Sequence, residues 1–445
     1  MDYLKLKDGD TVAILGGGPA GSFFVMHISG LARKLGISLN LIILERKSFV
    51  AHGPTGCNMC AGVLGGNIVN MISGLDLDLL KLDSRVIRQN VEGFKLNIQG
   101  RDALIMRPSS KVYTVFRGVG PRSEASSEGF IGFDSFLLEE AKRRGAAVIN
   151  GTVTDIRIPQ NPVVEQCTVL YQDEMNKSHE LKAALIVGAF GVNSSLSKKF
   201  RFGYVEPGYW HTCQTELMAR SESDITGYIN IFSRKQSKFL FTAITPKGKY
   251  LTVSGIGEHV KFSELVEELK ALHLDEAMNE NLTSVCHCHP RLPVTAAVRP
   301  FYTRVVMVGD ACVSRYMKNG IESAFITSMS AAQTVMMRGI DEAAFRDSYY
   351  PECVMKFMRD NRYGRAMFFM HTVITAHGRL GGAVIDTIND EGKGPIEKQW
   401  MSNISWHMFI GDEPYRAILR SILNIMEMIR FLFRIAGIKK RTHGK

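Results

Sequence analysis

The sequence TVAILGGGPAGSFF, which begins at Thr11, decides the fold. Thr11–Leu15 is a short apolar run typical of a buried strand, and the residues Ser22–Leu35 after the glycine-rich turn favour a helix. A second apolar run, Leu39–Leu44, predicts another strand and leads directly into Glu45. Strand, glycine-rich turn, helix and strand in this order predict one Rossmann-type unit.

The glycines of the turn satisfy G-x-G-x-x-G in the context that gives the motif its meaning. Gly16 would allow the tight turn, Gly18 would let backbone approach a pyrophosphate, and Gly21 would let the helix pack closely on the strand. The phosphates would then lie at the helix N-terminus, on backbone N–H groups that have no partner within the helix. We therefore assign the following residues to dinucleotide binding: Gly16, Gly18, Pro19, Ala20 and Gly21.

Glu45 follows Gly21 by 24 residues, close to the spacing of a carboxylate that accepts both ribose hydroxyls. We assign Glu45 and its neighbour Arg46 to the cofactor site as well. No second G-x-G-x-x-G occurs between a strand and a helix, because Gly255-Ile256-Gly257 lacks a third glycine. One Rossmann unit can hold NAD or FAD, so this part of the chain leaves the choice open.

A distant segment decides between the two cofactors. Val305–Ala324, VVMVGDACVSRYMKNGIESA, resembles the GD motif of FAD-dependent oxidoreductases related to geranylgeranyl reductases and aromatic hydroxylases. In that family the Asp binds the ribityl chain of FAD, and the next helix N-terminus faces the flavin pyrimidine. The resemblance therefore implies FAD, with contacts from Gly309, Asp310, Gly320 and Ile321.

Three further segments are similar to the same family. Gly132–Leu137 resembles its Phe-Asp stretch, and Ala184–Ser194 resembles a strand that usually ends in Ala-Asp-Gly. Thr55–Leu64, TGCNMCAGVL, resembles the Cys-Gly-Gly loop that geranylgeranyl reductases place beside the flavin. The resemblance implies flavin contacts from Cys60, Ala61 and Gly62. It also implies that Cys60 orients substrate or donates a proton.

The chain departs from the family at several positions. The Arg that precedes the Phe-Asp pair is absent, and Arg117 or Arg122 are the candidates to replace it. Phe190 stands in place of the Asp of Ala-Asp-Gly, which puts the docking of NAD(P)H in doubt. Only aromatic character and a displaced Pro in Phe239–Pro246 match the geranylgeranyl reductase signature, and the halogenase signature is missing. These departures leave the subfamily open.

The cysteines allow a second interpretation. Cys57 and Cys60 have metal-ligand spacing, and Cys286 and Cys288 alternate with histidines, so the four could hold zinc or an iron–sulfur cluster. A role of Cys60 beside the flavin, or plain buried thiols, explain the same residues. We assign no metal.

The fold class expected is α/β (α+β): a Rossmann-type FAD-binding domain, an antiparallel-sheet substrate domain and a C-terminal helical region. The FAD-binding domain would comprise residues 1–204 and 299–345. The substrate domain would comprise residues 205–298 with part of 90–130, and the helical region residues 346–445. In the substrate domain we expect a helix near Phe262–Leu272 after four strands: Tyr209–Leu217, Tyr228–Phe232, Phe239–Ile244 and Tyr250–Ile256. Phe239, Phe241 and Tyr250 would line its pocket or, more simply, fill its core.

Composition and charge exclude several classes of protein. The 445 residues are 45% apolar and 22% charged, which excludes a disordered or fibrous chain. Acidic residues precede the first apolar run, and the eight cysteines are irregularly spaced, so we expect a cytoplasmic protein without a signal peptide. The net charge of +10 is modest. Nucleic-acid binding is not expected, because the basic residues gather in one terminal helix without stacking aromatics.

The basic excess is concentrated at the C-terminus. Residues 401–445 contain eight basic and three acidic residues, so they carry half of the net charge. From Tyr415 to Ile438, apolar residues and arginines alternate at helical steps, and Lys439-Lys440-Arg441 follow. This pattern predicts a basic amphipathic helix, so residues 415–445 would lie peripherally on an anionic inner membrane surface or pack as a terminal helix. Thirteen of the 21 methionines lie beyond residue 300 and favour a flexible apolar pocket or a helical core.

These features favour an FAD-dependent oxidoreductase that reduces carbon–carbon double bonds of a prenyl-type or other lipophilic substrate. NAD(P)H or a reduced electron-donor protein would visit transiently. The first alternative is a flavin monooxygenase that hydroxylates through a C4a-hydroperoxyflavin, because one fold serves several chemistries. The second alternative is a non-catalytic flavin-binding protein.

Overall fold

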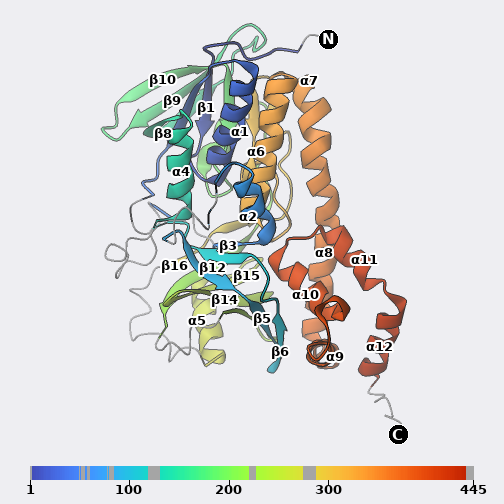
Figure 1. Ribbon diagram of the computed structural model, residues 1–445. Helices are drawn as coiled ribbons and strands as arrows, with labels where there is room; N and C mark the ends of the chain where they lie inside the picture. The colour runs from blue at the N-terminus through green and yellow to red at the C-terminus, as the bar shows by residue number, and fades with distance from the viewer. Residues whose placement is uncertain are drawn as a thin grey trace, which may run out of the picture. The chain divides into compact units, whose positions relative to one another are not determined.

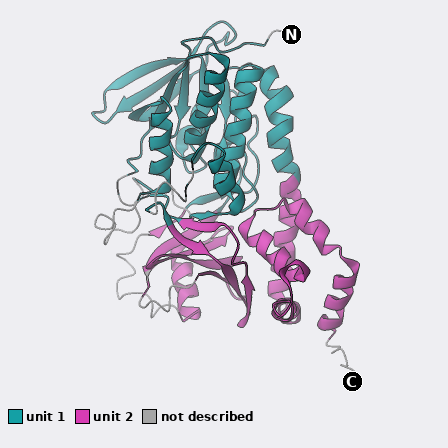
Figure 2. Cartoon of the chain, in the orientation of Figure 1, with its two compact units in different colours: residues 1–87, 115–210, 290–359 teal, residues 88–114, 211–289, 360–445 magenta. Residues whose placement is uncertain are grey.

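The computed structural model describes residues 3–49, 51, 56–57, 61–77, 79, 85–118, 131–219, 227–273 and 287–436. The chain forms two compact units (Figure 2). Unit 1 comprises residues 1–87, 115–210 and 290–359, and unit 2 comprises residues 88–114, 211–289 and 360–445. Both units are therefore assembled from segments that lie far apart in the sequence. Residues 360–445 belong to the same unit as the second sheet, whereas a separate helical region was predicted over 346–445.

Unit 1 is built on an eight-stranded sheet whose centre is parallel. Its middle strand carries the predicted residues Thr11–Leu15, and Val12 to Leu15 are fully buried. Such strands are covered on both faces, which explains their continuous apolar sequences. The strands in spatial order are β10 (Ser178–Ala183), β9 (Cys167–Asp173), β8 (Ala147–Arg157), β2 (Asn40–Glu45), β1 (Thr11–Leu15), β11 (Leu185–Gly188), β19 (Val305–Met307) and β18 (Phe301–Tyr302).

Two helices from opposite ends of the sequence pack against each other beside this sheet, α1 (Pro19–Leu35) and α6 (Gly320–Met337) (Figure 1). The ring of Phe325 receives Phe23 and His27 edge-on, at centroid distances of 5.1 and 4.7 Å. Helix α1 starts at Pro19, three residues before the predicted start, because proline suits the first helical position. Unit 1 also contains α2 (Gly66–Ser73), α4 (Phe133–Arg143), η2 (Ser195–Lys199), η6 (Gly309–Ala311), α7 (Glu342–Ala344), the π-helix η7 (Phe345–Val354) and the short strand β3 (Val63–Leu64).

Unit 2 contains the predicted antiparallel sheet, with one parallel pair between β13 and β5. Helix α5 (Phe262–Ala271) packs on one face, where Leu265 and Leu269 share a core with Phe239. Phe239, Phe241 and Tyr250 are all at most 4% exposed, as core residues are. The strands in spatial order are β16 (His287–Cys288), β12 (Tyr209–Met218), β15 (Tyr250–Gly257), β14 (Phe241–Lys247), β13 (Tyr228–Ser233), β5 (Gly93–Ile98) and β6 (Arg101–Met106). Three more short strands, β4 (Ile87–Val91), β7 (Val112–Val115) and β17 (Arg291–Pro293), complete the described strands.

The C-terminal part of the chain is helical, as predicted, but its last helix is divided. The single helix expected over 415–438 is two helices, because Asn424 breaks the run and accepts a hydrogen bond from the N–H of Glu427 at 3.4 Å. Asparagine is a favoured helix N-cap, so a new helix starts after it. The helices of this region are α8 (Met355–Ala376), α9 (Gly378–Glu391), η8 (Ile396–Lys398), α10 (Trp400–Ile410), α11 (Tyr415–Ile422) and α12 (Ile425–Ile435). Within the described ranges, no helix has the length and apolar content to cross a bilayer.

Candidate functional site

The glycine-rich turn after β1 has a backbone that side chains would disrupt. Gly16 has a φ of +116°, and a Cβ there would lie 2.5 Å from the carbonyl oxygen of Ala189. A Cβ on Gly21 would lie 2.0 Å from the carbonyl oxygen of Gly16. Both glycines are therefore required by close backbone contacts, as the motif predicts.

The turn ends at the N-terminus of α1, which is free of side-chain caps and acidic residues. Gly18 is the extended N-cap, and Pro19 occupies the first helical position. The first N–H groups of a helix have no partner within it and carry partial positive charge. This end of α1 therefore offers the donors that a pyrophosphate requires.

Glu45 lies at the end of β2 and contacts the same turn. Its carboxylate accepts the N–H of Gly17 at 2.7 Å and the N–H of Lys47 at 2.8 Å. Each oxygen retains a lone pair for a ribose hydroxyl. Arg46 is exposed beside it. The side chain of Lys47 was not among the predicted site residues. It donates to the carbonyl oxygen of Cys57 at 2.7 Å, and burial lowers the pKa of its ammonium group.

Asp310 stands on the short helix η6, where it is well placed for a polyhydroxyl chain. Its Oδ1 atom is buried and has no hydrogen-bond partner, although the residue as a whole is partly accessible. Burial raises the pKa of this carboxyl, while a hydrogen bond from Ser314 and the charge of Arg117 oppose the shift. A Cβ on Gly320 would lie 3.5 Å from Oδ1, so the start of α6 adjoins the carboxylate. A buried oxygen without a partner is what the ribityl hydroxyls of FAD would satisfy.

The two motifs meet in space. A Cβ on Gly309 would lie 2.7 Å from the Cβ of Ala20, at the start of α1. The hydroxyl of Ser328, in α6, donates to the carbonyl oxygen of Ala20 at 2.7 Å. The predicted pyrophosphate and ribityl contacts therefore form one continuous site. Their arrangement fits FAD.

The segment that leads into α6 has an unusual backbone. Met317 and Asn319 have φ values of +57° and +55°, in the left-handed region that side chains rarely adopt. Asn319 Nδ2 donates to Glu322 at 2.8 Å, and Arg315 pairs with the same buried carboxylate at 3.4 Å. Such strain persists only where surrounding contacts fix it, and it is concentrated at functional sites.

Arg117, one of the two candidates for the Arg that the family carries before its Phe-Asp pair, binds the Asp of that pair. Its guanidinium holds the fully buried carboxylate of Asp134 through two hydrogen bonds, from Nε and, at 2.8 Å, from Nη2. Because its charge also reaches Asp310, Arg117 links the start of α4 to the cofactor site. The other candidate, Arg122, lies outside the described residues.

Phe190 has a packing role that explains its departure from the family pattern. Its ring stacks on Phe200 at 5.6 Å and meets Tyr204 edge-on at 6.3 Å. The buried hydroxyl of Tyr204 donates to the carbonyl oxygen of Ala311 at 2.7 Å, and burial raises its pKa well above the usual range. An aromatic cluster therefore supports the turn that carries Asp310.

The cysteine loop is only partly described. Cys60 and Cys286 lie outside the described residues, so the predicted roles of Cys60 and of a four-ligand site stay predictions. Ala61 and Gly62 follow the loop, and the Gly62 carbonyl accepts the N–H of Val115 at 2.8 Å. In the part of the chain that is described, no group of three or more His, Cys, Asp or Glu side chains could hold a metal.

Burial makes several of the remaining thiols poor nucleophiles, because it raises the pKa of Cys167 to about 11 and those of Cys213 and Cys353 to about 12.

Two curated proteins are similar in sequence to the chain. Geranylgeranyl diphosphate reductase from the chloroplast of Nicotiana tabacum is 24% identical over 356 residues, which cover 75% of this chain and 69% of that protein. Geranylgeranyl diphosphate reductase from Synechocystis is 24% identical over 340 residues, which cover 73% of this chain and 75% of that protein. No protein-family model matches the chain.

Solved structures share the fold. A geranylgeranyl bacteriochlorophyll reductase-like protein from Thermoplasma acidophilum matches 96% of this chain and 100% of its own with a TM-score of 0.65 and 15% identity. p-Nitrophenol 4-monooxygenase from Pseudomonas putida matches 91% of this chain and 98% of its own with a TM-score of 0.58 and 12% identity.

The fold and the site define the class: the protein is an FAD-dependent oxidoreductase. Its sequence is similar to those of geranylgeranyl diphosphate reductases, and its fold is shared with a geranylgeranyl bacteriochlorophyll reductase-like protein and with a monooxygenase.

Proposed function

We propose that the protein reduces carbon–carbon double bonds of a prenyl-type or other lipophilic substrate. The observation that carries this proposal is the likeness to two geranylgeranyl diphosphate reductases over about three quarters of the chain. The apolar, methionine-rich C-terminal part of the chain supports the assignment of a lipophilic substrate, because methionine adapts to irregular apolar shapes. Bound and reduced FAD would supply the hydride for such a reduction.

The residues of the chain hold and orient that cofactor in the proposal. The N-terminus of α1 would bind the pyrophosphate, and Glu45 would accept the ribose hydroxyls. Asp310 would bind the ribityl chain, and the N-terminus of α6 would favour negative charge on the flavin pyrimidine. The supporting observations are the glycine cradle at Gly16 and the unpartnered Oδ1 atom of Asp310.

The second half of the reaction needs a proton, for which we propose Cys60. A thiol that stays protonated can act as a general acid. Cys60→Ser should slow turnover by tenfold or more, about 1.4 kcal/mol of barrier, while FAD affinity stays within twofold. Cys167→Ser, a change at a buried thiol of β9, is the control for general effects of a Cys→Ser change. Unchanged kinetics in Cys60→Ser would refute this role.

The electron donor would be NAD(P)H or a reduced protein that binds transiently.

The second candidate function is a flavin monooxygenase, because hydroxylases share the fold. The third candidate is a non-catalytic flavin protein, which the missing Arg and Phe190 suggested. Arg117 pairs with Asp134, and Phe190 packs in the aromatic cluster, so a structural role accounts for either position without loss of turnover.

Product analysis with and without oxygen tests the proposal. The holoprotein would be incubated with dithionite or NAD(P)H and geranylgeraniol or geranylgeranyl diphosphate. We expect products that have gained pairs of hydrogen atoms, in equal yield without oxygen. A product that has gained an oxygen atom, and forms only with oxygen, would establish the monooxygenase instead.

We also propose that the C-terminal helices bind an anionic membrane surface. At about 100° per residue, one face of α12 collects five large apolar side chains that are 46–71% exposed: Ile425, Met426, Ile429, Leu432 and Phe433. Exposed arginines accompany this face in the sequence, Arg430 on α12 and Arg416 and Arg420 on the preceding helix α11. An apolar face with a basic margin is the arrangement that binds anionic bilayers.

Vesicle sedimentation measures this binding. Leu432→Glu should lower the bound fraction on phosphatidylserine vesicles at least fivefold. Val164→Glu, at a residue 74% exposed in unit 1, should not. Equal sedimentation of both variants would contradict membrane docking through α12.

A further inference from the structure

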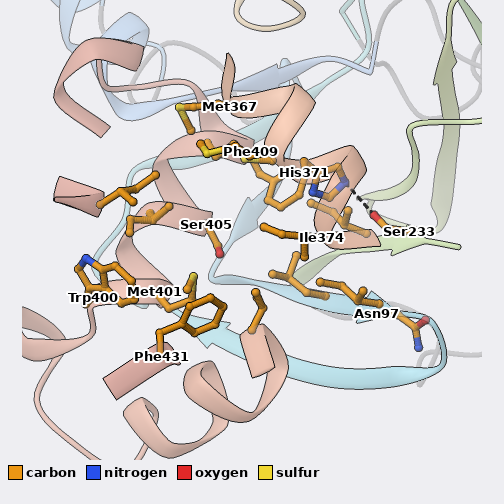
Figure 3. A pocket seen from close by; sticks show the side chains of 18 of the residues that line it. Asn97, Ser233, Met367, His371, Ile374, Trp400, Met401, Ser405, Phe409 and Phe431 are labelled. Atoms are coloured by element: carbon orange, nitrogen blue, oxygen red, sulfur yellow. Dashed lines mark hydrogen bonds between the residues drawn. The ribbon is translucent and has the colours of Figure 1, made fainter. Parts of the chain in front are cut away.

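Unit 2 contains a cavity of about 210 Å³ whose lining residues all belong to that unit (Figure 3). Strands β5 and β13 form one wall, and side chains of α8 to α12 form the others. For comparison, an apolar cavity of about 150 Å³ is large enough to bind a benzene-sized guest. The cavity can therefore hold a segment of a hydrocarbon chain.

The lining of the cavity suits a flexible apolar guest. Five methionines contribute to it, and methionine side chains adapt their shape without a large energetic cost. The lining polar groups include His371 and Ser233, which are joined by a hydrogen bond of 3.1 Å between Nε2 and Oγ and are therefore engaged with each other (Figure 3). The methionines are Met367, Met370, Met401, Met408 and Met428.

Helix α12 closes one side of the cavity with Met428 and Phe431. The helix is weakly held, because none of its residues is buried. The contacts that hold it include an edge-on contact of Phe431 with Trp400 at 6.3 Å and an ion pair of 2.7 Å between Arg434 and Asp390. Both partners of that ion pair are more than a third exposed, so it contributes at most about 1 kcal/mol.

Helix α12 thus has two apolar sides: one lines the cavity, and the other is the exposed face proposed above to meet a bilayer. We infer that the cavity binds the hydrocarbon chain of a lipid, and that α12 is the movable wall through which the chain enters from the membrane. This inference deepens the proposed function and rests on it only for the identity of the chain, a prenyl chain of the substrate or an acyl chain of the bilayer.

Quenching of tryptophan fluorescence by dibromostearic acid tests the inference. The chain has three tryptophans, and Trp210→Phe leaves Trp400 and Trp406, both on helix α10. Bromine quenches only at close range, so a chain in the cavity should quench this fluorescence in a saturable way. Val384→Phe would fill the cavity with an extra ring and should weaken the quenching affinity about tenfold or more.

Two further variants keep the result interpretable. Ser405→Leu adds apolar volume at a second point of the lining and replaces Val384→Phe if that variant does not fold. Val164→Phe, on the exposed surface of unit 1, should leave the affinity unchanged. No saturable quenching, or equal affinity in the cavity-filling variants, would overturn the inference.

Competition identifies the source of the chain. Displacement of the probe by geranylgeraniol at lower concentration than by stearic acid would assign the cavity to the prenyl chain. Equal displacement would assign it to bilayer lipids in general.

Intact quenching in a protein that fails to reduce prenyl lipids would refute the proposed function alone. Unchanged reduction in Val384→Phe that has lost quenching would separate the cavity from turnover.

Discussion

At the scale of single residues, Asp310 connects cofactor binding to stability. Its buried Oδ1 has no partner in the protein, and burial raises the pKa of the carboxyl above 3.8. A buried charge without a partner lowers the free energy of unfolding of the apoprotein. Hydrogen bonds from ligand hydroxyls would offset this loss when the cofactor binds.

Asp310→Asn should therefore move two measurements in opposite directions. FAD should bind about tenfold more weakly, because a charge-assisted hydrogen bond becomes a neutral one. The apoprotein should unfold at a higher temperature at pH 7. Since the folded pKa is raised, the wild type loses stability as pH rises from 3.8 through the folded pKa, so the gain should vanish below pH 3.8. Weaker FAD binding together with a less stable apoprotein would indicate a structural role instead.

Arg117 supports the same site through Asp134, and its removal leaves a buried carboxylate without its cation. Arg117→Ala should lower the free energy of unfolding by about 3–5 kcal/mol. Lys142→Ala, which breaks the exposed pair with Glu139 on the same helix α4, should cost less than about 1 kcal/mol. Urea unfolding measures both, and equal losses would contradict the account of Arg117.

The sequence motifs predicted these residues unequally. Gly16, Gly21 and Glu45 were predicted because short-range geometry fixes their spacing, and the structure brings them together. Arg117 was one of two candidates, because sequence spacing cannot say which residue of a loop reaches a helix. Tyr204 was not predicted. A tyrosine that donates to a backbone carbonyl carries no local pattern.

At the scale of elements, the N-terminus of α1 is the part on which the cofactor assignment depends. Gly18→Val should abolish FAD retention, because a branched side chain would stand where phosphate must approach. Gly30→Ala lies in the same helix, where a Cβ would meet nothing within 4 Å, and should keep FAD and stability. Absorption spectra of the purified variants measure the bound flavin. A Gly18→Val protein that retains flavin absorption would contradict the assignment of this turn to the cofactor.

The packing of α1 on α6 also predicts a pH dependence. Burial, and secondarily the charge of Arg144, lower the pKa of His27 from 6.5 to about 4. The unfolded chain therefore binds more protons between these values, and stability should fall by about 3 kcal/mol as pH drops from 6.5 to 4. His27→Leu should flatten this part of the profile, whereas His259→Leu, at an exposed residue, should not. If the stability of His27→Leu falls with pH in parallel with that of the wild type, the role of His27 is refuted.

Elements were predicted best where the hydrophobic period is uniform. The predicted strands, such as Thr11–Leu15 in unit 1 and Tyr209–Leu217 in unit 2, lie close to their observed positions, whereas β5, β6, β9 and β10 were not predicted. The division of the last helix into α11 and α12 was missed, because the apolar period continues through Asn424 while its side chain caps a new helix. The methionines beyond residue 300 favoured a flexible apolar pocket, but its position under α12 could not be predicted, since the cavity combines β5, β13 and five helices.

At the scale of the whole molecule, the class follows from the agreement of motif, fold and relatives. The central parallel sheet, the cradle around Gly16 and the unpartnered Oδ1 atom of Asp310 all suit FAD. The fold is shared by reductases and monooxygenases, so it does not choose the reaction. The choice depends on what reoxidises the reduced flavin.

A single-turnover experiment measures this directly. The holoprotein would be reduced with one equivalent of dithionite without oxygen, mixed with geranylgeranyl diphosphate, and followed by its flavin absorption and by the mass of the product. We expect oxidised flavin to return without oxygen, at the same rate as a product that has gained two hydrogen atoms. Flavin that stays reduced until oxygen is admitted, with a product that then carries an added oxygen atom, would contradict this expectation.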